Sequence, residues 1–495
     1  MADLTQGISI DDIPRDGVAG GEVNGEAVLL ARVGNEIVAI GGTCTHYSGP
    51  LAEGLRVGDT IRCPWHHACF DLRSGTALRA PALNPVPRWK VEREGDRVFV
   101  REKIEDAPAA PSASGGGTIV IAGGGAAGHA AAEMLRREGF GGRIVMVSAD
   151  AAPPVDRPNL SKDYLAGTAP EEWIPLRPPE FFDEHHIELM LNSTVTAIDA
   201  AKKTITCGGS ELAYDQLLLA TGAEPIHLPI PGAQKPHVHY LRTLADSRSI
   251  IASAASSKRV VVIGASFIGL EVAASLRARG LEVVVVAPDA TPLEKVMGRT
   301  VGGFIQRLHE QHGVVFRLGR KPAAIEDDKV QLDNGESLTA DLVVIGVGVR
   351  PNVKLAQDAG LRVDNGVIVD ERLRTSDPHI FAAGDIARWP DRRAGTAIRV
   401  EHWVVAQRQG QTAARNLLGR NEPFDAVPFF WSAHYDVSIN YVGYGAGWDS
   451  DEVSGDLDKH DATITYRAKG RIVAVATIFR DLESLRAEAA MEQAV

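Results

Sequence analysis

The sequence predicts a multidomain protein in which a small all-β domain precedes two α/β units and an α+β C-terminal domain. Three observations lead to this prediction. A length of 495 residues corresponds to three or four domains at roughly 100 to 200 residues each. Residues 1–104 contain short alternating apolar segments, which are typical of strands. A strand, a glycine-rich turn and a helix are predicted from Thr118 onward, and the same pattern returns at Arg259.

Composition excludes several classes of protein. Hydrophobic residues make up 44% of the chain and charged residues 23%, which is a globular rather than a disordered composition. The net charge of -12, with no Lys/Arg run of five or more, disfavours nucleic acid and anionic membranes as partners. The opening MADLTQGISIDDIPRDG does not resemble a secretory signal, and no apolar stretch approaches the roughly 18 residues of a membrane span. We therefore expect a cytoplasmic protein without membrane contact.

The first domain is expected over residues 1–104. The segments EAVLLARV, EIVAI and RVFV are separated by Gly, Pro and Asp and read as strands, and no helix is predicted among them. The following EDAPAAPSASGGG, residues 105–117, has no apolar periodicity and predicts a solvated linker. Such a linker would let the small domain dock on the rest of the chain and swing away.

Two Cys/His pairs in this domain predict a metal site. Cys44 and His46 form one pair and Cys63 and His66 the other, each in a loop between predicted strands. Two thiolates and two imidazoles can hold a tetrahedral zinc ion or a [2Fe-2S] cluster with cysteines on one iron and histidines on the other. The one-residue gap between Cys44 and His46 favours the cluster, because paired zinc ligands are usually spaced by two to four residues.

The sequences around these pairs, CTHYSGPLAEG and CPWHHACFDLRSG, resemble the Rieske ferredoxin family. The resemblance spans about the first 100 residues and implies that each loop gives one ligand to each iron. High-potential members have a disulfide where this chain has Gly49 and Trp65, and a serine where it has Ala68, so the resemblance implies a low-potential cluster. His67 follows His66 and is the alternative ligand. We expect Cys69 to be a buried small hydrophobe.

The first glycine-rich turn predicts a dinucleotide site in a Rossmann-like unit. Gly123, Gly125 and Gly128 follow the strand TIVIA and open a helix, so the helix N-terminus faces a pyrophosphate. An acidic residue should follow the next strand and bind the ribose hydroxyls, and Asp150 is the candidate, although it lies slightly late.

The second turn predicts a second dinucleotide site. Gly264 and Gly269 frame it, and Ser266 stands in the place of the middle glycine, which fits a dinucleotide with a less close backbone approach. Where an acid would bind the ribose, the strand VVVVAPDA offers only Asp289. Because no arginine stands where a 2′-phosphate would need one, we favour NADH over NADPH.

From residue 118 onward the chain resembles the two-dinucleotide flavoprotein family. The resemblance is based on Thr221 and Gly222 in ATG, Gly348 in GVGVRPN, and Gly384 and Asp385 in IFAAGDIA. It implies an FAD-binding domain from residues 118–235 and 356–415, with Asp385 on the ribityl chain, and an NAD(P)-binding domain over 236–355. The helix beside the flavin carries no cysteine, which excludes disulfide reductase chemistry there.

The segment DRPNLSK further resembles ferredoxin reductases of oxygenase systems and apoptosis-inducing-factor-like proteins. By that resemblance Arg157 and Lys162 approach the flavin, where a lysine ammonium would stabilise electron density on the reduced ring. We expect Trp403 and Trp431 to pack on or near the isoalloxazine, the alternative for each being a place in the apolar core. Glu271 and Glu401 are candidates near the nicotinamide, and we assign catalytic roles to Lys162, Glu401 and Trp403.

The C-terminal domain is expected over residues 416–495. FFWSAHYDVSINYVGYG and TITYRAKGRIVAVATIF predict strands, and DLESLRAEAAMEQA predicts an amphipathic helix. Together with the domains before it, this segment completes the predicted fold.

The predicted function is an electron relay. A nicotinamide delivers two electrons at once and a Rieske cluster accepts one, so a flavin must stand between them. We expect NADH to reduce FAD, the cluster to receive single electrons, and an external protein such as an oxygenase or ferredoxin to accept them. The alternative is a redox-sensing interaction protein related to apoptosis-inducing factors, with slow turnover. A monomer and a homodimer both remain open.

Overall fold

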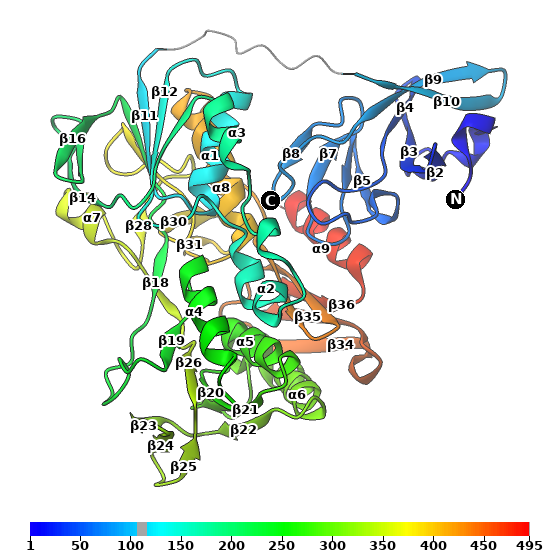
Figure 1. Ribbon diagram of the computed structural model, residues 1–495. Coiled ribbons are helices and arrows are strands. Elements are labelled where there is room, and N and C mark those ends of the chain that lie inside the picture. Colours follow the sequence, from blue (N-terminus) through cyan, green and yellow to red (C-terminus); the bar gives the residue numbers. More distant parts are fainter. Residues whose placement is uncertain (106–115, 495) are drawn as a thin grey trace.

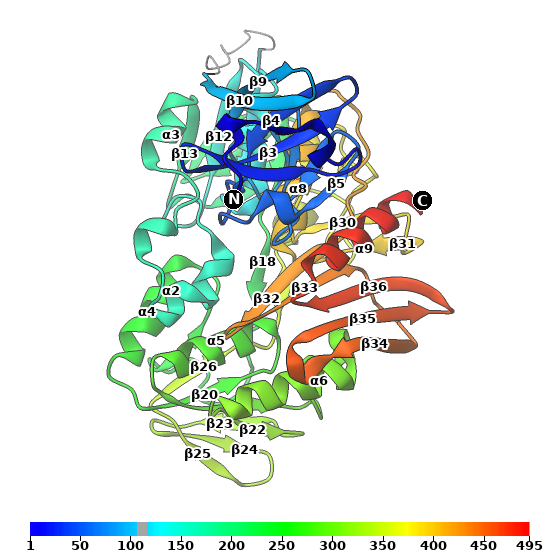
Figure 2. The ribbon, with the colours of Figure 1, turned by 90° about the vertical axis from the view of Figure 1, so that its right-hand side faces the viewer.

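The computed structural model describes residues 1–105 and 116–494, and most of the predicted linker at 105–117 lies outside these described residues. Figures 1 and 2 show the N-terminal β-domain seated beside the last helix of the chain, next to two α/β units and a C-terminal sheet. The predicted fold class is confirmed by this arrangement. The described part of the chain has no helix long and apolar enough to cross a membrane.

The N-terminal domain consists of two antiparallel sheets. Within its described residues, only short 3-10 turns interrupt the strands and no α-helix occurs. The larger sheet has the order β1-β10-β9-β4-β3-β2, and the smaller one, β5-β6-β7-β8, carries the Cys/His loops. The strands are β1 (Ile8–Ser9), β2 (Ala19–Val23), β3 (Glu26–Val33), β4 (Glu36–Gly41), β5 (Leu55–Val57), β6 (Thr60–Arg62), β7 (Cys69–Asp71), β8 (Ala77–Arg79), β9 (Arg88–Glu94) and β10 (Arg97–Ile104).

The first α/β unit is a parallel sheet of order β13-β12-β11-β17-β29. Its strands are continuous apolar runs because a parallel sheet is covered on both faces, and α1 packs against α8 on one of them. Its main elements are β11 (Thr118–Ala122), α1 (Ala126–Arg137), β12 (Arg143–Val147), α2 (Asp163–Ala166), α3 (Pro179–Glu184), β13 (Ile187–Met190), β17 (Gln216–Leu219), β29 (Ile380–Ala382) and α8 (Trp403–Leu417). Helix α8 passes the boundary that we predict at residue 415.

Smaller pieces complete this unit. Two small sheets and a short helix flank the parallel sheet: β14 (Val195–Asp199), β15 (Thr204–Cys207), β16 (Ser210–Ala213), α7 (Lys354–Asp358), β28 (Val367–Ile368), β30 (Ala387–Asp391) and β31 (Thr396–Ile398). Two strands cross between the α/β units and pair antiparallel, namely β18 (Ala223–Pro225) and β27 (Val349–Pro351). They follow Gly222 and Gly348, the two glycines of the predicted crossovers.

The second α/β unit repeats the plan with the order β19-β26-β20-β21-β22. A three-stranded antiparallel sheet lies beside it. The elements are β19 (Val238–Tyr240), α4 (Leu244–Ala254), β20 (Arg259–Ile263), α5 (Phe267–Ala278), β21 (Glu282–Ala287), α6 (Glu294–Gln311), β22 (Val315–Leu318), β23 (Pro322–Ile325), β24 (Lys329–Leu332), β25 (Ser337–Thr339) and β26 (Leu342–Ile345).

The C-terminal domain is a five-stranded antiparallel sheet of order β32-β33-β36-β35-β34, followed by α9. Its elements are β32 (Phe429–His434), β33 (Val437–Gly443), β34 (Ser450–Asp456), β35 (Asp461–Ala468), β36 (Arg471–Ile478) and α9 (Asp481–Gln493). The prediction of an amphipathic helix is wrong for α9: its buried positions are Ser484, Leu485 and Glu488, so its inner face is mainly polar. This face meets the N-terminal domain (Figure 1), where α9 contacts β5.

Candidate functional site

A cavity of about 430 Å³ lies between the two α/β units and the C-terminal sheet. Its wall brings together most of the predicted cofactor and catalytic residues. Those that line it are Gly125, Arg157, Lys162, Gly222, Ser266, Glu271, Gly348, Gly384, Asp385, Glu401, Trp403 and Trp431. The remaining glycines of the two turns, with Thr221, Asp150 and Asp289, are not among the residues that line it.

The first glycine turn has the shape that a pyrophosphate needs. A Cβ on Gly123, whose φ is +122°, would lie 2.2 Å from the carbonyl oxygen of Ala220, and one on Gly128 would lie 1.9 Å from that of Gly123. A Cβ on Gly125 would instead have only the Arg157 guanidinium as a neighbour, at 3.6 Å. No side chain caps α1 in the described structure, so its first amides remain available to an anion.

The second turn is closed by its serine. Ser266 Oγ donates to the carbonyl oxygen of Gly346 at 2.8 Å and accepts from the amide of Gly269 at 3.4 Å. A Cβ on Gly264 would lie 2.3 Å from the Gly346 carbonyl oxygen, which explains the glycine there. The Ser266 hydroxyl therefore connects the turn to the residue that follows β26. The position of Ser266 in the glycine motif does not predict this role.

Arg157 links the predicted ribose acid to the cavity. Its guanidinium lies 3.6 Å from Asp150, and its Nε is buried without a hydrogen-bond partner among the described residues. Burial, together with the nearby Arg242, lowers the pKa of Arg157 to about 10. Arg242 also donates to Asp385 at 2.8 Å. Arg242 stands outside every motif, so the sequence did not predict its place at the cavity.

Lys162 and Glu271 form a buried pair at the cavity wall. Lys162 Nζ lies 2.8 Å from Glu271 Oε2, although the two residues come from different α/β units. Glu271 accepts further hydrogen bonds from Ser161 at 2.5 Å and from Ser432 at 2.6 Å. Three donors therefore converge on the Glu271 carboxylate and hold it in a fixed position.

Other predicted residues lie at the edge of this arrangement. Glu401 pairs with Arg399 at 2.7 Å, and its burial raises the pKa of its carboxyl. Trp403 begins α8 and packs, like Trp431, against the apolar cluster around Phe429. Asp289 pairs with Lys295 at 3.1 Å and does not line the cavity.

Thr221 forms hydrogen bonds with Asn352 in the segment that returns from the second α/β unit. Its hydroxyl donates to the carbonyl oxygen of Asn352 at 3.3 Å, and the Asn352 amide donates back to the carbonyl oxygen of Thr221 at 3.0 Å. The second bond comes from the side-chain amide of Asn352, whose backbone N–H donates to the carbonyl oxygen of Gly222 at 2.9 Å. Together these bonds join the chain segments that cross between the α/β units and fix Gly222 at the cavity.

The two Cys/His loops of the N-terminal domain share one backbone pattern. The amide of Cys44 donates to the carbonyl oxygen of Gly49, and that of Cys63 donates in the same way to Ala68. In each loop the residue before that acceptor has positive φ, +61° at Ser48 and +60° at His67. The loops therefore present their side chains in a matched way.

The four predicted ligands form two pairs, thiols and imidazoles. The thiol of Cys63 donates a hydrogen bond to Cys44, which lowers the pKa of Cys44 and raises that of Cys63. Nδ1 of His46 lies 3.2 Å from Nδ1 of His66. Among the described residues, no three His, Cys, Asp or Glu side chains gather around a single ion position. Two separate pairs are what a cluster with cysteines on one iron and histidines on the other requires.

The imidazole pair faces the cofactor cavity. The ring centroids of His66 and Trp431 lie 4.3 Å apart, and those of His46 and Trp431 lie 6.3 Å apart. Tyr47 stacks on His46 with centroids 4.0 Å apart and donates a hydrogen bond to Asp156 of the first α/β unit. We call these rings the ring patch: His46, Tyr47 and His66 against Trp431.

His67, the alternative ligand, points away from this patch. Its Nδ1 lies 2.8 Å from Glu488 and its Nε2 lies 3.2 Å from Ser484, both on α9. The ring also stacks on Phe429, with centroids 4.0 Å apart. Both ring nitrogens of His67 are thus engaged by the C-terminal domain, which leaves His66 as the histidine beside His46.

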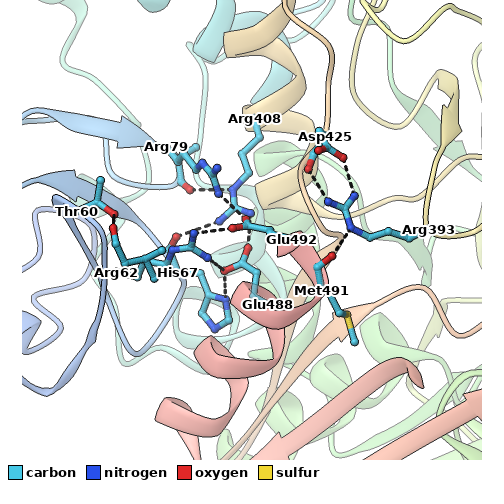
Figure 3. Close-up of polar contacts among 12 residues, drawn as sticks. Thr60, Arg62, His67, Arg79, Arg393, Arg408, Asp425, Glu488, Met491 and Glu492 are labelled. Atoms are coloured by element: carbon cyan, nitrogen blue, oxygen red, sulfur yellow. Dashed lines mark hydrogen bonds and ion pairs between the residues drawn. The ribbon is translucent and has the colours of Figure 1, made fainter. Parts of the chain in front are cut away.

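A charge cluster fixes the N-terminal domain to α8 and α9 (Figure 3). It comprises Arg62, His67 and Arg79 of the N-terminal domain and Arg408, Glu488 and Glu492 of the other side. Glu488 is fully buried and lies 2.7 Å from Arg408. Burial would raise the pKa of Glu488, but Arg408, His67 and Arg62 outweigh it and hold the pKa well below its ordinary value.

These observations fit both cofactors. The open face of Gly125, the uncapped start of α1 and the unpartnered Nε of Arg157 suit the pyrophosphate of FAD. The paired thiols and paired imidazoles suit a [2Fe-2S] cluster, and burial keeps the pKa of His46 at about 3, so that its ring is neutral as a metal ligand must be.

Comparison with known proteins agrees with this geometry. The family model described as pyridine nucleotide-disulphide oxidoreductase matches residues 117–410, the Rieske [2Fe-2S] domain model matches 7–90, and the reductase C-terminal model matches 429–495. The solved complex of putidaredoxin reductase with putidaredoxin superposes with a TM-score of 0.74 at 36% identity and covers 76% of this chain and 93% of its own.

Two relatives differ in how much of this chain they match. Human apoptosis-inducing factor 3 is 33% identical over 476 residues, which cover 92% of this chain and 78% of that protein. Rhodocoxin reductase of Rhodococcus erythropolis is 39% identical over 362 residues, which cover 72% and 85%. The chain therefore belongs to the FAD- and NAD-dependent pyridine nucleotide-disulphide oxidoreductase family, with a Rieske [2Fe-2S] domain at its N-terminus and a reductase C-terminal domain at its end.

Proposed function

We propose that this oxidoreductase passes electrons from NADH through FAD to its own Rieske cluster and from there to an external acceptor. The contact between His66 and Trp431, with ring centroids 4.3 Å apart, is the observation that supports the internal route. Trp431 lines the cofactor cavity on one side and touches a predicted cluster ligand on the other. One side chain thus spans the distance between the two redox sites.

A bound FAD supplies the step between two-electron and one-electron chemistry. The chain's own residues prepare the cavity for it. The start of α1 and Arg157 provide positive charge for the pyrophosphate, and Asp385 offers its carboxylate to the ribityl chain. Lys162 holds an ammonium at the cavity wall, where it favours added negative charge. Trp403 and Trp431 exclude water from one side.

The external acceptor that we propose is a ferredoxin or an oxygenase. A relative from Burkholderia cepacia, 39% identical over 355 residues, is named the ferredoxin-NAD(+) reductase component of an anthranilate 1,2-dioxygenase system. The putidaredoxin reductase structure contains its ferredoxin partner. Either a monomer or a homodimer of this chain could deliver electrons in this way.

The redox-sensing alternative is less favoured. Apoptosis-inducing factor 3 matches nearly the whole chain at 33% identity, but the reductases match its flavoprotein part at 39%. We therefore expect rapid turnover with an artificial acceptor such as ferricyanide.

Anaerobic titration with NADH, followed by visible absorption and EPR, tests the proposal. We expect flavin bleaching and then a Rieske EPR signal in the same molecule. Cys63→Ala should keep FAD and lose the EPR signal, whereas Cys207→Ala, which changes a buried cysteine far from the loops, should keep both. Zinc in place of iron, or a cluster that stays oxidised after the flavin has bleached, would contradict the proposal.

A further inference from the structure

A hydrogen-bonded chain of side chains runs from the cofactor cavity to the protein surface. We propose that it is a proton relay serving the flavin site, and this inference rests on the proposed function. We call it the relay chain. From the cavity outward its members are Lys162, Glu271 of α5, Ser432 and His434 of β32, His309 of α6, and Tyr435.

Every link of the relay chain is within hydrogen-bond distance. Beyond the Lys162–Glu271 pair, Ser432 Oγ lies 2.6 Å from Glu271 Oε1 and 3.2 Å from His434 Nε2. His434 Nδ1 lies 3.3 Å from His309 Nε2, and His309 Nδ1 lies 3.3 Å from the Tyr435 hydroxyl. Both imidazoles use both ring nitrogens, which is the arrangement that passes a proton through a histidine.

The interior of the relay chain is closed to solvent and its outer end is not. Ser432, His434 and His309 are fully buried, and Glu271 is 2% exposed. Tyr435 is half-buried and stacks on the exposed His312, with ring centroids 3.6 Å apart. A proton relay must exchange protons with solvent, so one of its ends has to reach the surface. The outer end at Tyr435 meets this requirement.

The hydrogen bond that Glu271 accepts from Ser432 fixes the direction of the other hydrogen bonds. Because a carboxylate only accepts, Ser432 donates to it, His434 Nε2–H donates to Ser432, and His309 Nε2–H donates to His434. The Tyr435 hydroxyl then donates to His309. This order requires neutral rings, and burial lowers the pKa of His434 to about 3 and that of His309 well below its ordinary value.

The relay chain can carry one proton in and the same number out per cycle. An inward transfer moves one hydrogen along every link, protonates Glu271 and reverses each hydrogen bond. An outward transfer restores the starting order, so alternating directions need no ring rotation. Reduction of the bound cofactor by NADH takes up one proton with the hydride, and its oxidation in two single-electron steps releases it again.

One proton entering and one leaving through the relay chain is consistent with the overall reaction. One NADH and two oxidised one-electron acceptors give NAD⁺, one proton and two reduced acceptors. The proton that enters and later leaves through the relay chain cancels. The net proton is the one that the hydride carried, and it leaves to water through the open side of the cavity. Glu271, which lines the cavity, exchanges the proton there beside the Lys162 ammonium, while Ser432, His434, His309 and Tyr435 connect it to water.

The test measures proton uptake separately from electron transfer. A pH-indicator dye in weak buffer reports proton uptake when NADH is mixed anaerobically with the holoprotein, and absorption reports flavin bleaching. We expect the two signals to coincide in the natural protein. Ser432→Ala and His309→Phe should delay proton uptake by at least about tenfold, and Ser432→Thr should restore it. His185→Gln, an exposed histidine outside the relay chain, is the matched control.

A second measurement does not depend on turnover. In ¹⁵N-histidine NMR spectra of the folded protein, Ser432→Ala should change the tautomer signals of His434 and His309 and leave those of His185 unchanged. Unaltered proton uptake in both Ser432→Ala and His309→Phe, with melting temperature and flavin content kept, would overturn the relay.

Failure of the relay and failure of the proposed function give different results. If the natural protein reduces its cluster but the variants take up protons at the natural rate, only the relay is refuted. If the cluster never reduces while the variants still delay proton uptake at the flavin, the relay holds and the internal electron route is refuted.

Discussion

Two of the patches through which the N-terminal domain contacts the rest of the chain differ in chemistry. The ring patch is uncharged and places His66 4.3 Å from Trp431. The charge cluster is buried and holds Glu488 between Arg408, Arg62 and His67. Aromatic contacts tolerate small shifts, whereas buried ion pairs need exact partners. The difference indicates that the charge cluster fixes the position of the N-terminal domain. The ring patch depends on that position, which holds His66 against Trp431.

The largest effect is expected from Glu488→Gln. The change removes one charge from the carboxylate that Arg408, Arg62 and His67 share, and breaking a buried pair from one side costs about 3–5 kcal/mol. The docked arrangement should weaken, so cluster reduction after NADH addition should slow while flavin bleaching keeps its rate. Small-angle scattering reports the accompanying expansion. Glu483→Gln, on an exposed part of the same helix, is the control, and a cluster reduced at the natural rate in Glu488→Gln would argue against this role.

A smaller effect is expected from Trp431→Leu, which removes the ring between the two redox sites and leaves the charge cluster intact. Cluster reduction should slow by about tenfold, equivalent to ~1.4 kcal/mol in the barrier, with unchanged scattering. Stopped-flow absorption and freeze-quench EPR measure it. Trp173→Phe changes a tryptophan that is 70% exposed and should have no effect. Equal slowing in both variants would show that the ring patch has no special part.

Acid should loosen the charge cluster in a defined direction. The pKa of Glu488 is lower in the folded protein than its ordinary value of 4.5, so its stabilisation is complete above that pH and is lost as the pH falls toward the folded pKa. The loss is at most about 1.4 kcal/mol per pH unit. The difference in melting temperature between the natural protein and Glu488→Gln, measured from pH 7 to 3, should stay constant well above pH 4.5 and narrow progressively below it. Parallel curves would refute the assignment.

The smallest effect is expected from Arg79→Ala at the rim of the charge cluster. Arg79 lies 2.6 Å from Glu492, but its side chain is 41% exposed, and exposed pairs contribute about 0–1 kcal/mol. Denaturant unfolding should detect a change of that size at most. A loss as large as that of Glu488→Gln would place the centre of the charge cluster at Glu492 instead.

Patterns that repeat over short distances predict most of the fold and much of the site. The apolar runs TIVIA and RVVVI predict the first strands of the two parallel sheets, and both form. The pairs Cys44/His46 and Cys63/His66 predict a cluster site, and the structure brings the thiols together and the imidazoles together. Such signals lie within a few residues of one another, so local spacing carries them.

Residues whose partners lie far away in the sequence could not be predicted. Arg242 meets Asp385, 143 positions later, and Glu271 meets Ser432, 161 positions later. The amphipathic prediction for α9 failed for the same reason, because Glu488 faces inward only where Arg408 and His67 surround it. No local pattern marks a charged residue as buried.

By itself the sequence determined the order of domains, the two dinucleotide turns and the cluster loops, since each depends on backbone and ligand spacing over a short segment. Only the tertiary structure decided that His67 forms hydrogen bonds with α9 while His66 contacts Trp431. It also decided that the relay chain reaches the surface and that a buried charge cluster holds the N-terminal domain. Those features join segments hundreds of residues apart, and their energy depends on burial that exists only once the domains have packed together.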